Sequence, residues 1–216
     1  MIARRLPEPR ISVSYPGLKS LSVPERRGRC YTSPTVDRGF DALFVARFHR
    51  SKGVFDLPLI WAAVVERVPH ARLAMVGYCD DSRLRELEAE CERHGVRSAV
   101  DILGFVSPDD LEGPYTTARV FVFPSHEEGY GMAISDALCR GLPVVAWDLP
   151  TYREHFSDCV VQVPEDDITA FAEAIVCELQ GEKAKDWETK RASWLTYQRT
   201  WEEVADQEWA LTVGSF

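Results

Sequence analysis

Residues 120–147 read VFVFPSHEEGYGMAISDALCRGLPVVAW. The run Val120–Phe123 contains only β-branched and aromatic residues, which is typical of a strand buried on both faces. A polar loop with two glycines follows, and the pattern is then helical from Met132 until Gly141, a residue type that often ends helices. Residues 142–147 predict a second buried strand. The stretch therefore predicts a strand, a loop, a helix and a strand, with the polar loop at the carboxyl end of the first strand.

The same alternation of strands and helices extends over most of the chain. Apolar runs predict strands at residues 41–46, 72–76, 100–103, 120–123, 142–147 and 159–163. Helical patterns with start and stop signals predict helices at residues 54–67, 82–94, 107–116, 132–140, 152–155 and 168–179. We expect the second of these helices to be capped by Asp81 or Ser82. The expected fold class is α/β, a doubly wound parallel sheet with helices on both faces.

The chain divides into three predicted parts. Residues 1–39 are rich in Pro, Arg, Ser and Gly and show no sustained period, so we interpret them as a linker. Residues 40–180 form the sheet domain, and residues 181–216 form a helical extension. Four side chains of that extension are tryptophan: Trp187, Trp194, Trp201 and Trp209. They could pack on their own domain or cross to a partner domain, and the sequence leaves both open.

Composition limits the classes of function. The formal net charge of −9 argues against a general nucleic-acid surface. No apolar run approaches the ~20 residues that a membrane-spanning helix needs, and we recognise no signal peptide. Six scattered cysteines without a C-x-x-C pair suggest idle thiols in a reducing cytoplasm rather than a zinc site. We therefore expect a cytoplasmic protein, with peripheral membrane association left open.

Two loops are expected to meet and form a site. In a doubly wound sheet, ligands bind where the strand order reverses, here between the first and fourth strands. The loop after the first strand carries Arg47 and Lys52, and the loop after the fourth carries residues 128–131. Glycines and the free N–H groups of a helix start can hold a phosphate, while Glu128 and Asp136 can accept hydrogen bonds from sugar hydroxyls. A solvated acidic helix start would explain the two carboxylates equally well.

The stretch PSHEEGYGMAISDALCRGLPVVA, residues 124–146, resembles the signature of the retaining glycosyltransferases of family 4, which have the GT-B fold. In that family the pattern is approximately P-S-x-x-E-G-[FY]-G-x-x-x-x-E-A-[ML]-[AS]-x-G-x-P-V-[IV]-A. Asp136 is the main departure, because the family usually has glutamate there. The stretch ARFHRSKG, residues 46–53, is similar to the family's G-R-x-x-x-x-K-G motif, with Ala46 replacing the first glycine.

The resemblance implies a Rossmann-like carboxyl-terminal half of a GT-B enzyme that binds a nucleoside diphosphate sugar. It implies that Arg47 and Lys52 neutralise the diphosphate, that Glu128 binds hydroxyls of the donor sugar and that Asp136 binds the ribose. The shorter Asp136 puts the ribose contact in doubt. The other implied donor-binding residues line the same sheet edge: Gly77, Phe105, Val106, His126, Gly129, Tyr130, Gly131 and Met132. His126 could reach a phosphate or could only pack on the loop.

The implied reaction transfers a sugar to an unknown acceptor with retention of configuration. The sequence contains no Asp-x-Asp triplet, so we expect neither a metal nor another cofactor. Residues 11–18 resemble the family's interdomain hinge, which implies an amino-terminal Rossmann-like domain or a separate partner chain, and we expect no sugar transfer by this chain alone. A non-catalytic nucleotide-binding subunit and a nucleotide-sugar epimerase or hydrolase remain alternatives. An oxidoreductase is disfavoured, since no G-x-G-x-x-G follows the first strand.

Overall fold

Across the part of the chain that the structure describes, six parallel strands form one sheet in the order β3-β2-β1-β4-β5-β6. The strands are β1 (Ala42–Val45), β2 (Leu73–Val76), β3 (Val100–Gly104), β4 (Val120–Phe123), β5 (Val144–Trp147) and β6 (Val160–Val163). The structure is a computed structural model, and it describes residues 39–107, 110–181 and 184–213. The strand order reverses between β1 and β4, as predicted.

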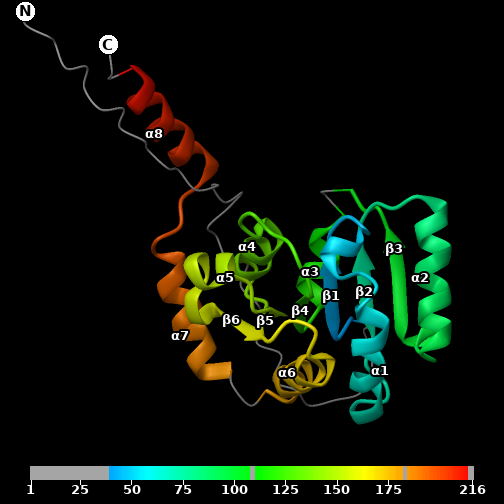
Figure 1. Cartoon of the computed structure of the whole chain (residues 1–216). Coiled ribbons are helices and arrows are strands. Elements are labelled where there is room, and N and C mark those ends of the chain that lie inside the picture. The colour runs from blue at the N-terminus through cyan, green and yellow to red at the C-terminus, as the bar shows by residue number, and fades with distance from the viewer. Residues whose placement is uncertain (1–38, 108–109, 182–183, 214–216) are drawn as a thin grey trace, which may run out of the picture. The chain divides into compact units, whose positions relative to one another are not determined.

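At least one helix follows each strand in the chain (Figure 1). They are α1 (Leu57–Arg67), α2 (Asp81–Arg93), α3 (Glu112–Thr117), α4 (Met132–Cys139), α5 (Pro150–His155), α6 (Ile168–Gln180) and α7 (Ala184–Leu195), with short 3-10 turns η1 (Arg50–Lys52), η2 (Arg97–Ala99) and η3 (Ser157–Cys159). Right-handed crossovers place α1 and α2 on one face and α3, α4 and α5 on the other. Helix α6 returns to pack on α1. The predicted α/β fold with a doubly wound parallel sheet is confirmed.

The predicted buried strands form the centre of the core. Every residue of β2, β4 and β5 is buried, whereas the edge strands β3 and β6 are partly exposed. The ring of Phe121 stacks on that of Tyr115 from α3. It also stacks on the ring of Phe123, two residues further along the same strand. The indole of Trp147 packs edge-on against Phe171 of α6. The unbroken apolar runs therefore mark strands that are covered on both faces.

Four helix starts differ from the sequence prediction, and one of them is that of α5, which begins at Pro150 rather than at residue 152. Helix α1 begins at Leu57 rather than at residue 54, with proline in its first turn, and α2 is capped by Asp80. Helix α3 begins at Glu112 instead of residue 107. Pro114 explains this late start, because proline lacks an N–H donor and fits only the first turn of a helix. The predicted linker and hinge, residues 1–38, lie outside the described residues.

The described residues form two units, 39–197 and 198–213. In the first, the indole N–H groups of Trp187 and Trp194 donate to the carbonyl oxygens of Cys159 and His155, both at 2.9 Å. These two tryptophans of α7 therefore pack on their own domain. The second unit contains α8 (Trp201–Val213). Thr200 and Glu203 form a reciprocal capping box at its start.

Candidate functional site

The loops that follow β1 and β4 meet at the carboxyl edge of the sheet. The two strands are neighbours, with Ala42 opposite Val120. Beyond them, the backbone N–H of His126 donates to the carbonyl oxygen of Ser51 at 2.9 Å, and the Ser125 hydroxyl donates to the same oxygen at 3.1 Å. The predicted convergence of the two loops is therefore confirmed.

Gly53 allows this close approach of the two loops. Its φ is +67°, a left-handed conformation that side chains other than glycine rarely adopt. A Cβ atom at this position would lie 1.7 Å from the carbonyl oxygen of Pro124. The glycine after Lys52 is thus required both by its own backbone and by the loop that it touches.

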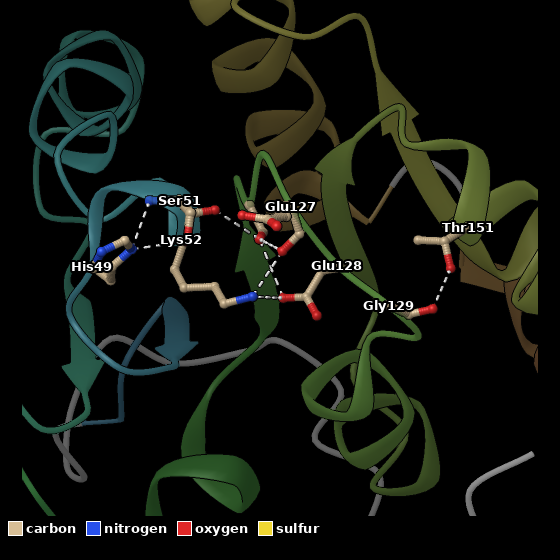
Figure 2. A network of polar contacts seen from close by, with 8 residues as sticks. His49, Ser51, Lys52, Glu127, Glu128, Gly129 and Thr151 are labelled. Carbon is tan, nitrogen blue, oxygen red and sulfur yellow. Dashed lines mark hydrogen bonds and ion pairs between the residues drawn. The ribbon is translucent and has the colours of Figure 1, made fainter.

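Lys52 and Glu128 form an ion pair between the loops (Figure 2). Lys52 Nζ lies 2.7 Å from Glu128 Oε1 and 2.8 Å from the carbonyl oxygen of Glu127. Both side chains are largely shielded from solvent, with exposures of 19% and 13%. The fully buried Ser125 hydroxyl has a single hydrogen, which is shared among Glu128 Oε1 at 3.2 Å and the carbonyl oxygens of Ser51 and Glu127, both at 3.1 Å. The carboxylate of Glu128 is therefore held from two sides by donors.

The glycine loop is fixed by the segment at the start of α5. Gly131 has a φ of +102°, and a Cβ there would lie 3.0 Å from the Phe156 ring and 3.1 Å from the Tyr152 ring. Thr151 Oγ1 donates to the carbonyl oxygen of Gly129 at 3.0 Å (Figure 2). Burial, together with the charge of Glu128, raises the pKa of the Tyr152 hydroxyl. The rings of Tyr152 and Phe156 thus pack against the loop at Gly131, and Thr151 holds it at Gly129.

Sequence reasoning missed Ser125, Thr151 and Tyr152 as parts of this site. Ser125 belongs to the quoted motif, but a serine beside a proline reads as an ordinary loop residue. Thr151 and Tyr152 follow β5, so their position at the same sheet edge could have drawn attention to them.

Two other predicted site residues, Arg47 and Asp136, are not part of this ion pair. Arg47 is exposed, and its side chain makes no hydrogen bond or ion pair with the described residues. Asp136 lies on α4, where its Oδ1 is 3.4 Å from Arg140 Nη1. Arg140 also pairs with Glu112 at 2.9 Å and lies over the Tyr115 ring. The predicted contacts of Arg47 and Asp136 with a donor stay predictions.

The remaining predicted donor-binding residues lie at the same edge of the sheet. The N–H of Gly77 donates to the carbonyl oxygen of Gly104 at 2.8 Å and so joins the ends of β2 and β3. The side chain of Phe105, the next residue, is 73% exposed. Val106 is half-buried next to it. Met132 is 46% exposed at the first turn of α4.

Tyr130 and His126 make defined side-chain contacts. The Tyr130 ring lies 4.7 Å from the His155 ring, measured between centroids. The two ring nitrogens of His126 lie 2.6 Å from the carboxylates of Asp56 and Glu165. The ring therefore contacts two other segments of the chain, and the predicted contact of His126 with a phosphate stays a prediction.

The described residues contain no group of three or more His, Cys, Asp and Glu side chains placed to hold a metal ion. None of their helices combines the length and the apolar character that crossing a bilayer requires.

Comparisons with known proteins place this geometry in context. The sequence model of the family described as "Glycosyl transferases group 1" matches residues 39–180. The chain is 32% identical over 105 residues to O-antigen chain mannosyltransferase B of Escherichia coli, covering 49% of the chain and 28% of that protein. It is 25% identical over 198 residues to GDP-mannose:cellobiosyl-diphosphopolyprenol alpha-mannosyltransferase of Xanthomonas oryzae pv. oryzae, covering 91% and 49%. The chain thus spans half or less of the length of these relatives.

Solved structures share the fold. Sucrose-phosphate synthase from Thermosynechococcus elongatus superimposes with a TM-score of 0.71 at 24% identity, over 83% of this chain and 46% of that one. WaaG, a glycosyltransferase involved in lipopolysaccharide biosynthesis, gives a TM-score of 0.67 at 21% identity, over 79% and 46%. The Rossmann-like fold expected of one half of a GT-B enzyme is therefore confirmed.

Proposed function

The chain belongs to the family of group 1 glycosyl transferases, and from this premise we propose that it binds the nucleoside diphosphate sugar of a sugar transfer that retains anomeric configuration. The observation that carries the proposal is the meeting of Lys52 and Glu128 where the strand order reverses. Such a donor joins a negatively charged diphosphate to a sugar. The cation Lys52 can bind the diphosphate, and the carboxylate of Glu128 can accept hydrogen bonds from the sugar hydroxyls.

Lys52 can hold a diphosphate without leaving Glu128. An ammonium group has three N–H donors, and the described contacts of Lys52 use two of them, on Glu127 and Glu128. The third can donate to a phosphate oxygen, and the exposed guanidinium of Arg47 can add a second cation. Together they would stabilise the charge that develops on the departing diphosphate.

The first turn of α4 supplies the other half of the phosphate site. Helix starts present free backbone N–H groups and a partial positive charge. Here the left-handed Gly131 precedes the helix and carries no side chain that could block an approaching phosphate. Glu128, three residues earlier, would accept hydrogen bonds from hydroxyls of the donor sugar.

We propose that the acceptor binds against a second Rossmann-like domain or a partner chain, and that no metal is needed. Under this proposal the 216-residue chain binds donor but transfers no sugar by itself. Robust turnover by the purified chain would contradict that part of the proposal. Product analysis without an acceptor separates transfer from epimerase or hydrolase activity.

Calorimetry against UDP, GDP and ADP and their sugars tests donor binding. One relative is named for GDP-mannose, so the GDP series comes first. We expect Glu128→Ala to weaken the nucleotide sugar about 10–100-fold, the loss of one or two charged hydrogen bonds, while free nucleotide binds almost unchanged. Arg47→Ala should weaken both ligands.

Arg50→Ala is the matched control, because Arg50 lies in the same turn as Lys52 but is exposed and paired with Glu86. It should bind every ligand as the unaltered chain does. EDTA should leave binding unchanged. Absence of binding to every nucleotide and nucleotide sugar would refute the proposed function.

A further inference from the structure

His126 joins three segments of the chain through its ring. Nε2 lies 2.6 Å from Asp56 Oδ2, at the start of α1, and Nδ1 lies 2.6 Å from Glu165 Oε1, in the loop between β6 and α6. Asp56 occupies the N-cap position of α1, yet its side chain does not cap the helix. The carboxylate that would ordinarily satisfy the helix start is instead directed to the histidine ring.

Counting protons defines the state of this cluster. A neutral imidazole has one N–H donor and one acceptor nitrogen, whereas an ionised carboxylate can only accept. With a carboxylate at hydrogen-bond distance from each nitrogen, two N–H donors are required. A neutral ring would place a lone pair against the negative charge of Asp56 or Glu165 at 2.6 Å. The geometry is thus satisfied when His126 is an imidazolium cation.

The surroundings of the cluster favour keeping that proton. Partial burial lowers the pKa of His126, but the hydrogen bonds and charges of Glu165 and Asp56 outweigh it, so the pKa is raised. Burial raises the pKa of Asp56 against the opposing effect of His126, and the charge of Asp166 raises it further. The Trp147 ring is the apolar neighbour of the imidazole. If the ring were neutral, the carboxylates of Asp56 and Glu165 would have no cation between them, and the charge of Asp166 would add to that of Asp56.

The anchored residue is two positions before Glu128. The backbone N–H of His126 also bonds to Ser51, the neighbour of Lys52. The backbone of His126 is therefore bound to the loop that carries Lys52, and its ring is bound to Asp56 and Glu165. Loss of the ring contacts would remove the connection of this stretch to the start of α1 and to the loop before α6.

We propose that His126 is a positioning residue, which as an imidazolium binds Asp56 and Glu165 together and so fixes the acidic loop for the donor. The consequence for donor affinity rests on the proposed function, whereas the state of the ring does not. Because a raised pKa means that the folded chain holds the proton more tightly, the anchor is complete below about pH 6.5, the ordinary pKa of histidine. It is lost as the pH rises through the pKa of His126 in the folded chain.

Nuclear magnetic resonance of the full 216-residue chain, with ¹⁵N-labelled histidine, tests the state of the ring. The signal of His126 is assigned by its loss in His126→Gln. We expect both ring nitrogens to be protonated at pH 6 and the titration midpoint of His126 to lie above about pH 6.5, the ordinary pKa of histidine. A titration midpoint of His126 at or below about pH 6.5 overturns the proposal.

Asp56→Asn and Glu165→Gln test the two contacts separately. Each removes one charge and keeps the shape of the side chain, so each should lower the titration midpoint of His126. His94→Gln is the matched control, since His94 is 3.8 Å from Glu90 on α2 and outside the cluster. It should leave the His126 midpoint where it is. An unmoved midpoint in both Asp56→Asn and Glu165→Gln also overturns the proposal.

Calorimetry of the best-binding nucleotide sugar at pH 6 and pH 9 tests the coupling to the loop. We expect about tenfold weaker binding at pH 9 for the unaltered chain, the loss of about one hydrogen-bonded contact, and a clearly smaller pH effect in His126→Gln. Equal pH effects in the two proteins overturn the positioning role even if the ring is an imidazolium. Absence of binding at both pH values refutes the proposed function instead, while the ring titration still reports on the cluster.

Discussion

Lys52 and Glu128 are 76 positions apart in the chain, yet Lys52 Nζ lies 2.7 Å from Glu128 Oε1. Both side chains are largely shielded from solvent, so each charge is stabilised mainly by the other rather than by water. This contact links the two motifs on which the proposed function rests.

Lys52→Ala should both destabilise the fold and abolish measurable donor binding. It leaves the shielded Glu128 without its cation, which costs about 1–3 kcal/mol when a charged group loses its partner. Denaturant unfolding and calorimetry measure the two effects. Arg50→Ala, in the same turn, should change neither, and equal losses in both variants would contradict a specific role for Lys52.

Gly53→Ala should destabilise the chain by roughly 3 kcal/mol or more, since it combines backbone strain with a clash. Its Cβ would meet the Pro124 carbonyl oxygen at 1.7 Å. Gly95→Ala is the matched control, because Gly95 has a φ of +70° but no heavy atom within 4 Å of a built Cβ. It should cost only the ~1–2 kcal/mol of a left-handed alanine. Similar unfolding free energies for the two variants would mean that the loops are not in contact.

Ser125→Ala should cost about 1–3 kcal/mol of stability, because it removes a buried donor to Ser51 and Glu128. It should also weaken the binding of a nucleotide sugar. Ser135→Ala is the comparison: Ser135 is equally buried, but its hydroxyl has no hydrogen-bond partner among the described residues. Unfolding of Ser135→Ala should therefore differ little from that of the unaltered chain.

Asp136→Glu should tighten nucleotide binding about 3–10-fold, because the side chain gains ~1.5 Å of reach toward a ribose. Asp136→Asn should weaken binding, since it removes the charge but keeps the length. Calorimetry with the nucleoside diphosphate alone isolates the ribose contact from the sugar contact. Unchanged affinity in both variants would exclude Asp136 from the donor site.

Three cysteines should be inert to Ellman's reagent at pH 8 in the native chain. Burial raises the pKa of Cys91 and Cys159 to about 11 and that of Cys139 to about 12. The thiolate is the reactive form, and at pH 8 it is then about one part in a thousand or less. All six cysteines should react in denaturant. Rapid labelling of Cys139 in the native chain would contradict its burial.

The fold was predictable because its signals are local. The unbroken apolar runs at β2, β4 and β5 indicate strands covered on both faces, and Gly141 indicates the end of α4. The start of α3 was predicted five residues early, because the S-P-D-D stretch is a start signal while Pro114 limits where the helix can begin.

The site was predictable only in part. Lys52 and Glu128 could be brought together because strand order alone makes their loops neighbours. The position of Thr151 and Tyr152 after β5 was a usable signal, but their contacts and those of His126 could not be predicted, since they depend on how α5 and the loop before α6 pack against the motif. Such contacts join segments whose spacing in the sequence carries no periodic signal.

Because the strand order reverses at β1 and β4, a donor bound as proposed would bridge the two halves of the sheet. The strands up to β3 are contributed by residues before 105 and the others by residues after 119, and the two sets adjoin at this one seam. A donor bound to Lys52 and Glu128 would span the seam. Saturation at a hundred times the dissociation constant would then add about 2.7 kcal/mol against separation of the two halves.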